Sequence, residues 1–277
     1  MARRPDRSGV DAAAGLEFLD DDYRNCWSRS SARPDHRRCD SVRRWLPEFQ
    51  PRLADGGAPD ITIHQLLTHT AGLSYVLGAV IAKATGQSLP QAVAELVLTP
   101  LGMTDTGFAI ADPGRLVAHY GDGKPEPRRL AADDQVEFLG GLVDFSPVRL
   151  LEQRAYPSGG AGMAGTAGDV LKFLETLRAG GLLQPETREA MFTVQAQTNG
   201  QAEGPGWEFG LGGAVLVDAK AAGTPQAPGS LQWNGAYGHK WFIDPANELT
   251  VLALTNTTFE GMVGRFPADV RNAVYGA

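Results

Sequence analysis

The sequence of 277 residues is poor in cysteine and lysine, and it has no long hydrophobic run. No stretch of about 18 consecutive apolar residues occurs, so we expect no membrane-spanning helix. The Arg3-Arg4 pair lacks the apolar segment that follows such a pair in an export signal. These absences predict a cytoplasmic protein with no membrane partner.

The charge balance excludes a second class of partners. The formal net charge is −7, whereas nucleic acids and anionic membranes attract basic patches. Hydrophobic residues make up 43% of the chain and charged residues 21%, values typical of a soluble domain with a sizeable core. We therefore expect a small-molecule ligand and no nucleic acid.

The two cysteines, Cys26 and Cys39, give little support for a metal site. His36 lies near them in sequence, but there is no Cys-x-x-Cys pair and no fourth ligand. We predict two free thiols and no metal. The segments "GLGG" and "SGGAG" lack the lysine and the strand–helix context of a phosphate-binding loop, so no nucleotide cofactor is expected either.

The chain changes character near Asp40. Residues 1–39 are rich in arginine and show no hydrophobic period, which is typical of a disordered tail or of a segment translated out of frame. Residues 40–277 have regular helix and strand signals. We therefore predict an atypical segment over residues 1–39 and one domain over residues 40–277.

Helix signals dominate the first part of this domain, and strand signals the last third. Capping boxes at Thr62/Gln65 and Ser88/Gln91 predict two helix starts. The predicted helices cover residues 63–72, 76–86, 88–98, 166–180, 185–192 and 267–275, and the predicted strands lie within 207–218, 229–244 and 248–257. We expect the side chains of Ile81 and Leu171 to be buried. This order predicts an α+β fold, an antiparallel sheet flanked by helices.

Four segments carry a family resemblance: "ITIHQLLTHTAGL", "TPLGMTDTGF", "YPSGGAGMAGTAGDVLKFL" and "WNGAYGHKWFIDPANELTVLALTNT". In this order they resemble the serine β-lactamase/penicillin-binding-protein superfamily, in particular the class C β-lactamase-related carboxylesterases. The resemblance implies ester or β-lactam hydrolysis through an acyl-enzyme. A Ser-x-x-Lys motif supplies the nucleophile and base, a tyrosine motif helps to move the proton, and a third motif on an edge strand lines the substrate.

The first of these motifs is absent. The residues three positions before the five lysines are Val80, Gly121, Asp169, Val217 and Tyr237, and none is serine. Ser41 and Ser146 begin Ser-x-x-Arg sequences, but a guanidinium stays protonated and cannot act as the base. We therefore predict that the acyl-enzyme chemistry is impaired.

The tyrosine motif is also missing. In relatives a long segment separates "HTAGLSY" from the helix that begins "VLGAVI", and the catalytic tyrosine lies at its end. Here Tyr75 directly precedes Val76, so the join is interpreted as a deletion and the helical region as incomplete. A tight helix–turn–helix remains the alternative, and Tyr75 is a weak candidate for a substitute proton carrier.

Trp233-Asn234-Gly235 occupies the place of the third motif and forms the predicted substrate-binding wall. Trp233 is either that wall or a core aromatic, and Asn234 is expected to narrow the space beside it. Ser158 is the weak candidate for a relocated nucleophile, and His239 and Asp244 are imaginable triad partners. His69 is interpreted as a helix-end or core histidine.

Three functions stay open at this point. The first is a family member without its chemistry, the second a non-catalytic protein that binds an ester or β-lactam-like ligand, and the third an active esterase with a relocated serine. Loss of a core helix would also expose apolar surface. We therefore expect poor solubility or a molten character.

Overall fold

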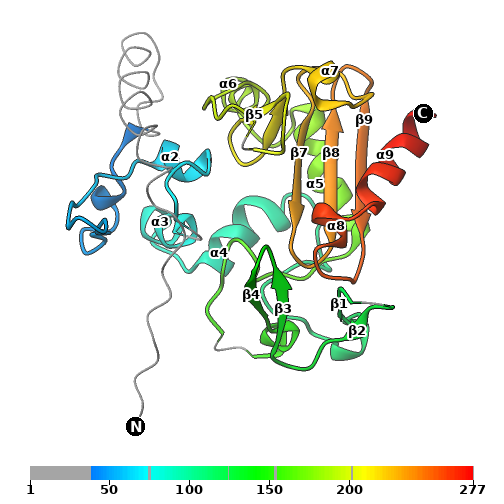
Figure 1. Cartoon of the computed structure of the whole chain (residues 1–277). Coiled ribbons are helices and arrows are strands. Elements are labelled where there is room, and N and C mark those ends of the chain that lie inside the picture. The colour runs from blue at the N-terminus through cyan, green and yellow to red at the C-terminus, as the bar shows by residue number, and fades with distance from the viewer. Residues whose placement is uncertain (1–38, 74–75, 124, 153–154, 201, 277) are drawn as a thin grey trace.

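A computed structural model describes residues 39–73, 76–123, 125–152, 155–200 and 202–276. Its centre is a five-stranded antiparallel sheet, in the order β5 (Trp207–Phe209), β6 (Ala214–Leu216), β7 (Leu231–Gly235), β8 (His239–Asp244) and β9 (Leu249–Leu254). Helix α5 (Ala167–Ala179) lies behind the sheet, while α8 (Glu260–Val263) and α9 (Phe266–Tyr275) cover the opposite face (Figure 1). The predicted α+β fold, an antiparallel sheet flanked by helices, is confirmed.

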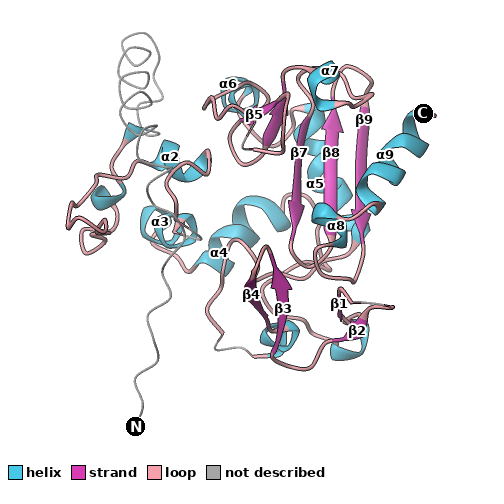
Figure 2. Cartoon of the chain, in the orientation of Figure 1, coloured by secondary structure: helices cyan, strands magenta, loops and turns pink. Residues whose placement is uncertain are grey.

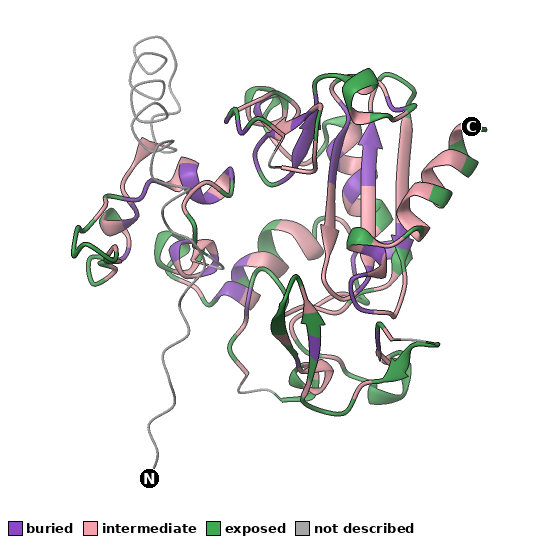
Figure 3. Cartoon of the chain, viewed as in Figure 1, coloured by how far each residue is buried: buried purple, intermediate pink, exposed green. Residues whose placement is uncertain are grey.

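The alternation of side chains along β7 and β8 separates two cores. Leu231 and Ile243 are cross-strand partners and pack with Leu174 and Leu177 of α5. The side chains of the neighbouring residues along each strand point to the opposite face of the sheet, as in any strand. Phe242, for example, lies on the α9 face, where its ring stacks on that of Tyr275. The sheet is therefore buried on both sides (Figure 3).

Two smaller parts complete the fold. The hairpin of β3 (Asp134–Phe138) and β4 (Gly141–Phe145) packs through Val136 and Phe145 against Phe259, below the β7–β8 turn (Figure 2). Around it lie short elements, η4 (Pro113–Arg115), β1 (Tyr120–Gly121), β2 (Arg128–Arg129) and η5 (Pro147–Leu151). Helices α6 (Pro185–Met191) and α7 (Ala219–Ala222) flank β5 and β6.

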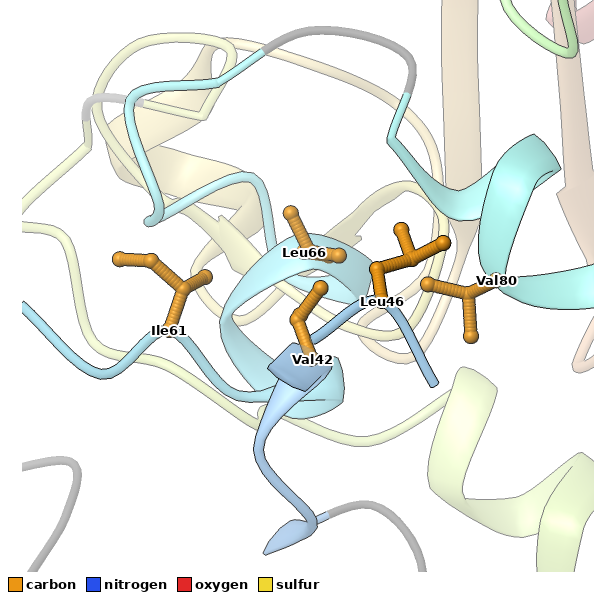
Figure 4. Close-up of a cluster of buried hydrophobic side chains, with 5 residues drawn as sticks. All are labelled: Val42, Leu46, Ile61, Leu66 and Val80. Carbon is orange, nitrogen blue, oxygen red and sulfur yellow. The ribbon is translucent and has the colours of Figure 1, made fainter. Parts of the chain in front are cut away.

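The N-terminal helices form a separate cluster beside the sheet. It contains η2 (Val42–Arg44), α2 (Ile63–Leu67) and α3 (Leu77–Thr85), followed by α4 (Leu89–Val93) and the π-helix η3 (Ala94–Leu98). Val42, Leu46, Ile61, Leu66 and Val80 make its core (Figure 4). Both predicted capping boxes are present, at Thr62/Gln65 and Ser88/Gln91.

Three expectations about the helices are wrong. Helix α2 ends at Leu67 and not at Gly72, because the Thr68 hydroxyl bonds the His64 carbonyl oxygen and His69 turns to a φ of 56°. Ile81 is 38% exposed because α3 packs into its core through Val80, and Leu171 is 40% exposed because α5 packs through Leu174 and Leu177.

Cys39 is disulfide-bonded, so the expectation of two free thiols is wrong, and the other cysteine lies outside the described residues. The predictions for residues 1–38 and Tyr75 lie outside them as well. Among the described residues, no helix is both long and apolar enough to cross a membrane. The expected molten character stays a prediction.

Candidate active site

The Trp233-Asn234-Gly235 wall lies at the free end of β7. Strand β6 pairs with β7 only at Leu231 and Gln232, so the three residues of the wall extend past it. On their other side they pair with β8, with Asn234 opposite Lys240 and Gly235 opposite His239. Trp233 is half-buried, which leaves part of the indole accessible beside the N-terminal helices.

The turn after α2 contacts this wall. The amide N–H of Gly212, in the β5–β6 turn, donates to the Leu67 carbonyl oxygen over 2.9 Å. Two residues later, the imidazole of His69 stacks on Trp233 with ring centroids 4.8 Å apart and an angle of 17° between the planes. Phe209 of β5 lies 5.5 Å from the same imidazole. His69 is exposed, so it is not a core histidine, while its position directly after the α2 cap residue Thr68 agrees with the helix-end interpretation.

Asn234 does not narrow the space beside Trp233, contrary to expectation. Its side chain lies on the opposite face of the strand, where its amide donates to the carboxylate of Glu203. The ammonium of Lys240 donates to the same carboxylate over 3.0 Å, and Gln232 donates over 3.4 Å. Sequence reasoning missed Glu203, which comes from the loop before β5.

The Glu203–Lys240 pair is largely shielded from water, with side chains 13% and 11% exposed. Burial lowers the pKa of Lys240, and the nearby Arg271 lowers it further, while Glu203 opposes the change. The pair lies on the face of β7 and β8 that is turned away from Trp233. Its ammonium therefore does not supply the base that the missing motif would provide.

The structure does not bring the imagined triad together. His239 and Asp244 stand at opposite ends of the six-residue strand β8, and because their separation in sequence is odd, their side chains point to opposite faces of the sheet. Asp244 is fully buried and accepts hydrogen bonds from the Tyr275 hydroxyl, from the Ala227 amide and from Asn247. Although burial raises the pKa of Asp244, these donors bring it below its usual value. Asp244 anchors α9 and leaves no free carboxylate for a base.

Ser158 is only 6% exposed, and its surroundings are unlike those of a nucleophile. Its hydroxyl accepts the Gly160 amide hydrogen over 3.3 Å, and the Gly162 amide closes the turn onto the Ser158 carbonyl oxygen over 2.9 Å. A Cβ at Gly162 would come within 2.5 Å of that oxygen, so the turn requires glycine there. No described lysine or histidine donates to or accepts from this hydroxyl.

No other cofactor or ligand site emerges around these residues. No three histidine, cysteine or acidic side chains gather closely enough to hold a metal among the described residues. A surface hollow of about 480 Å³ lies beside α4 and η3, and it contains none of the candidate residues. It is lined by Gln87, Gln91, Ala94, Glu95 and Thr99.

The chain matches the family described as Beta-lactamase over residues 39–274. It is 45% identical to the esterase EstB of Burkholderia gladioli over 291 positions, covering 84% of this chain and 74% of the esterase. The chain belongs to the β-lactamase family. The family resemblance seen in the four sequence segments is thereby confirmed.

Solved structures agree with this assignment. EstCE1, described as a hydrolase with promiscuous acyltransferase activity, superposes on this β-lactamase-family chain with a TM-score of 0.82 at 41% identity, covering 86% of this chain and 78% of that one. The simvastatin synthase LovD of Aspergillus terreus, at 22% identity and a TM-score of 0.65 for one of its mutants, shares the fold, with 92% of this chain and 77% of that chain covered.

The alignment with EstB contains a further observation. Its 291 positions cover 84% of the 277 residues here, about 233, so about 58 positions of the esterase have no counterpart within the matched part of this family member. This internal shortfall means that the matched part of this chain is shorter than the matched part of the esterase.

Three histidines near the site predict how stability depends on pH. The rings of Trp233 and Phe209 shield part of the exposed His69 from water, and His119 and His239 are partly buried, so the pKa of each imidazole lies below 6.5. The buried Nδ1 of His239 has no hydrogen-bond partner among the described residues. Below pH 6.5 the unfolded chain therefore binds more protons than the folded one, and stability falls as the pH falls.

We expect the free energy of unfolding, from urea titrations, to decrease between pH 7.5 and 5.5. The carboxylates with lowered pKa titrate below this window, since their ordinary value is 3.8. The variant His119→Gln should reduce the slope of the free energy of unfolding against pH in this window. Stability that is flat or rises on acidification would contradict the expectation.

Proposed function

We propose that this chain is an esterase-related member of the β-lactamase family that has lost acyl-enzyme turnover and retains one wall of the ligand site. The observation that carries the proposal is the absence of Ser-x-x-Lys anywhere in the 277 residues. Nucleophile and base act as one unit, so loss of both removes about 10⁶-fold in rate in a well-studied serine hydrolase.

The remaining lysines support this proposal. Lys172 donates to the Asp169 carboxylate and to the Gly102 carbonyl oxygen, and Lys240 is paired with Glu203. Lys83 and Lys220 are exposed side chains on α3 and α7. None of these four is hydrogen-bonded to a serine hydroxyl, so no described Ser–Lys pair replaces the missing motif.

Two large apolar side chains near the join are partly exposed. Leu73, just before the join, is 37% exposed, and Ile81, on the helix after it, is 38% exposed. Large apolar side chains on helices usually face a packed neighbour. We infer that a segment lost at the join would have covered this surface and carried the tyrosine motif.

Hydrolysis of p-nitrophenyl butyrate and nitrocefin by the purified full chain tests the proposal. We expect rates equal to those of buffer, for the wild type and for Ser158→Ala alike, and a thermal melt of the same samples tests the expected molten character separately. Turnover abolished by Ser158→Ala would overturn the proposal and identify Ser158 as the nucleophile. Covalent labelling of a different serine by a fluorophosphonate, together with turnover, would overturn it as well.

A further inference from the structure

His69 follows the end of α2 in the left-handed conformation, with a φ of 56°. Its amide donates to the Leu66 carbonyl oxygen over 3.4 Å, and the Thr70 amide donates to the Gln65 carbonyl oxygen over 3.0 Å, a hydrogen-bond pattern that commonly ends a helix. The residue is exposed, so its side chain projects from this helix end at the surface.

Two threonines enforce this turn. Thr68 is fully buried, and its hydroxyl bonds the His64 carbonyl oxygen over 2.9 Å and the Thr70 hydroxyl over 3.0 Å. The Thr70 amide donates to the Gln65 carbonyl oxygen over 3.0 Å. These bonds fix the backbone on both sides of His69 and therefore the direction of its Cα–Cβ bond.

That direction places the imidazole flat on Trp233. Trp233 in turn lies 5.7 Å from Phe209, which is buried, so the three rings form an aromatic platform of His69, Phe209 and Trp233 whose exposed member is His69. The inner face of the imidazole is covered by the indole, while the residue as a whole is exposed. The nearby charges, Glu203 and Lys240, neutralise each other on the opposite face of β7.

We propose that the aromatic platform binds a planar, uncharged aryl group, and that His69 is a ligand-binding residue of this site. A ring placed on the outer face of the imidazole would continue the stack, an arrangement that aromatic pairs favour. An uncharged ligand fits because the platform presents no unpaired charge. This inference rests on the proposed function in one respect: because the chain lacks turnover, a bound ligand is not cleaved.

Binding of 2-acetylnaphthalene, a planar ketone without a scissile ester, tests the proposal separately from hydrolysis. The full chain is titrated with this ketone and with cyclohexyl methyl ketone, which has the carbonyl group but no flat ring. Imidazole signals of His69 and His119 are followed by NMR. We expect saturable shifts of the His69 signals with the naphthyl ketone only, and no shift of His119.

The variant His69→Gly makes the test decisive, because glycine adopts a φ of 56° without strain and removes only the ring. It should melt at or above the wild-type temperature. Its dissociation constant for 2-acetylnaphthalene, measured by calorimetry, should be weaker by about threefold to tenfold, the range of one aromatic contact. Trp233→Leu should weaken binding similarly.

His119→Leu is the matched control, because His119 also contacts an aromatic ring, Tyr237, with centroids 5.3 Å apart, yet stands outside the platform. It should leave the dissociation constant unchanged. Absence of saturable binding, equal affinity for both ketones or an equal loss in His119→Leu would each overturn the proposal. Ester turnover in the separate assay would instead overturn the proposed function and leave the binding result standing.

Discussion

Replacing Glu203 by alanine should lower the free energy of unfolding by about 3–5 kcal/mol, the range found when one partner of a buried ion pair is removed. The carboxylate accepts hydrogen bonds from Lys240, Asn234 and Gln232, and it is 13% exposed. Its loss would leave an ammonium that is 11% exposed without its counter-charge. The amide of Asn234 would lose its acceptor as well.

The pH dependence of this variant identifies the cause. Burial already lowers the pKa of Lys240, and Glu203 is the group that opposes this shift. Without it, the pKa of Lys240 in the folded state should fall further below that in the unfolded state than in the wild type. The free energy of unfolding of Glu203→Ala should therefore rise more steeply than that of the wild type as the pH increases from 7 towards 10.

A second ion pair provides the matched control. Arg265 and Asp269 lie 3.8 Å apart on α9, with side chains 92% and 61% exposed. Asp269→Ala should change the free energy of unfolding by no more than about 0.5 kcal/mol, and it should not acquire a new dependence on high pH. The double variant Glu203→Leu/Lys240→Met should recover most of the lost stability. Equal effects of Glu203→Ala and Asp269→Ala on the free energy of unfolding would contradict the expectation that the buried Glu203–Lys240 pair matters more for stability than the exposed pair.

The local part of this fold could be predicted from sequence because its signals are local. Both capping boxes involve residues three positions apart, and the helix ends at Gly86 and Gly180 use glycine in the left-handed conformation. The hairpin of β8 and β9 follows from a four-residue turn between two alternating segments. Each of these features is determined within about ten residues of chain.

The site could not be predicted to the same extent, because its contacts are distant in sequence. Glu203 reaches Lys240 across 37 residues, and no spacing rule connects a loop carboxylate to a strand lysine. The predicted helix extends to Gly72 because that glycine resembles a stop signal, whereas α2 ends at Leu67, where the Thr68 hydroxyl bonds back to the His64 carbonyl oxygen. The exposure of Ile81 depends on which neighbouring segment is present.

The position of the Trp233 wall depends on one glycine that the sequence does not single out. Gly261 of α8 is buried against the β7–β8 turn. A Cβ there would lie 2.2 Å from the carbonyl carbon and oxygen of Gly238 and 2.5 Å from the amide nitrogen of His239. These are backbone atoms on a hydrogen-bonded turn, so they cannot move aside as a flexible side chain would.

Gly261→Ala should therefore lower the free energy of unfolding by more than about 3 kcal/mol, above the usual range for overpacking. The clash would push α8 away from the turn and loosen the paired ends of β7 and β8. Hydrogen exchange should show this as faster exchange at His239 and Lys240 than at Phe242 and Ile243, which lie further along β8. Urea titration gives the total loss of stability.

Gly168→Ala in α5 is the control that separates steric overlap from the general effect of a new methyl group. No atom lies within 4 Å of a Cβ built at Gly168, and alanine is favoured over glycine within helices by up to about 1 kcal/mol. This variant should be as stable as the wild type or slightly more stable. If both glycine variants behave alike, α8 does not hold the turn in place, and the position of Trp233 must depend on its stack with His69 and its pairing with Trp241.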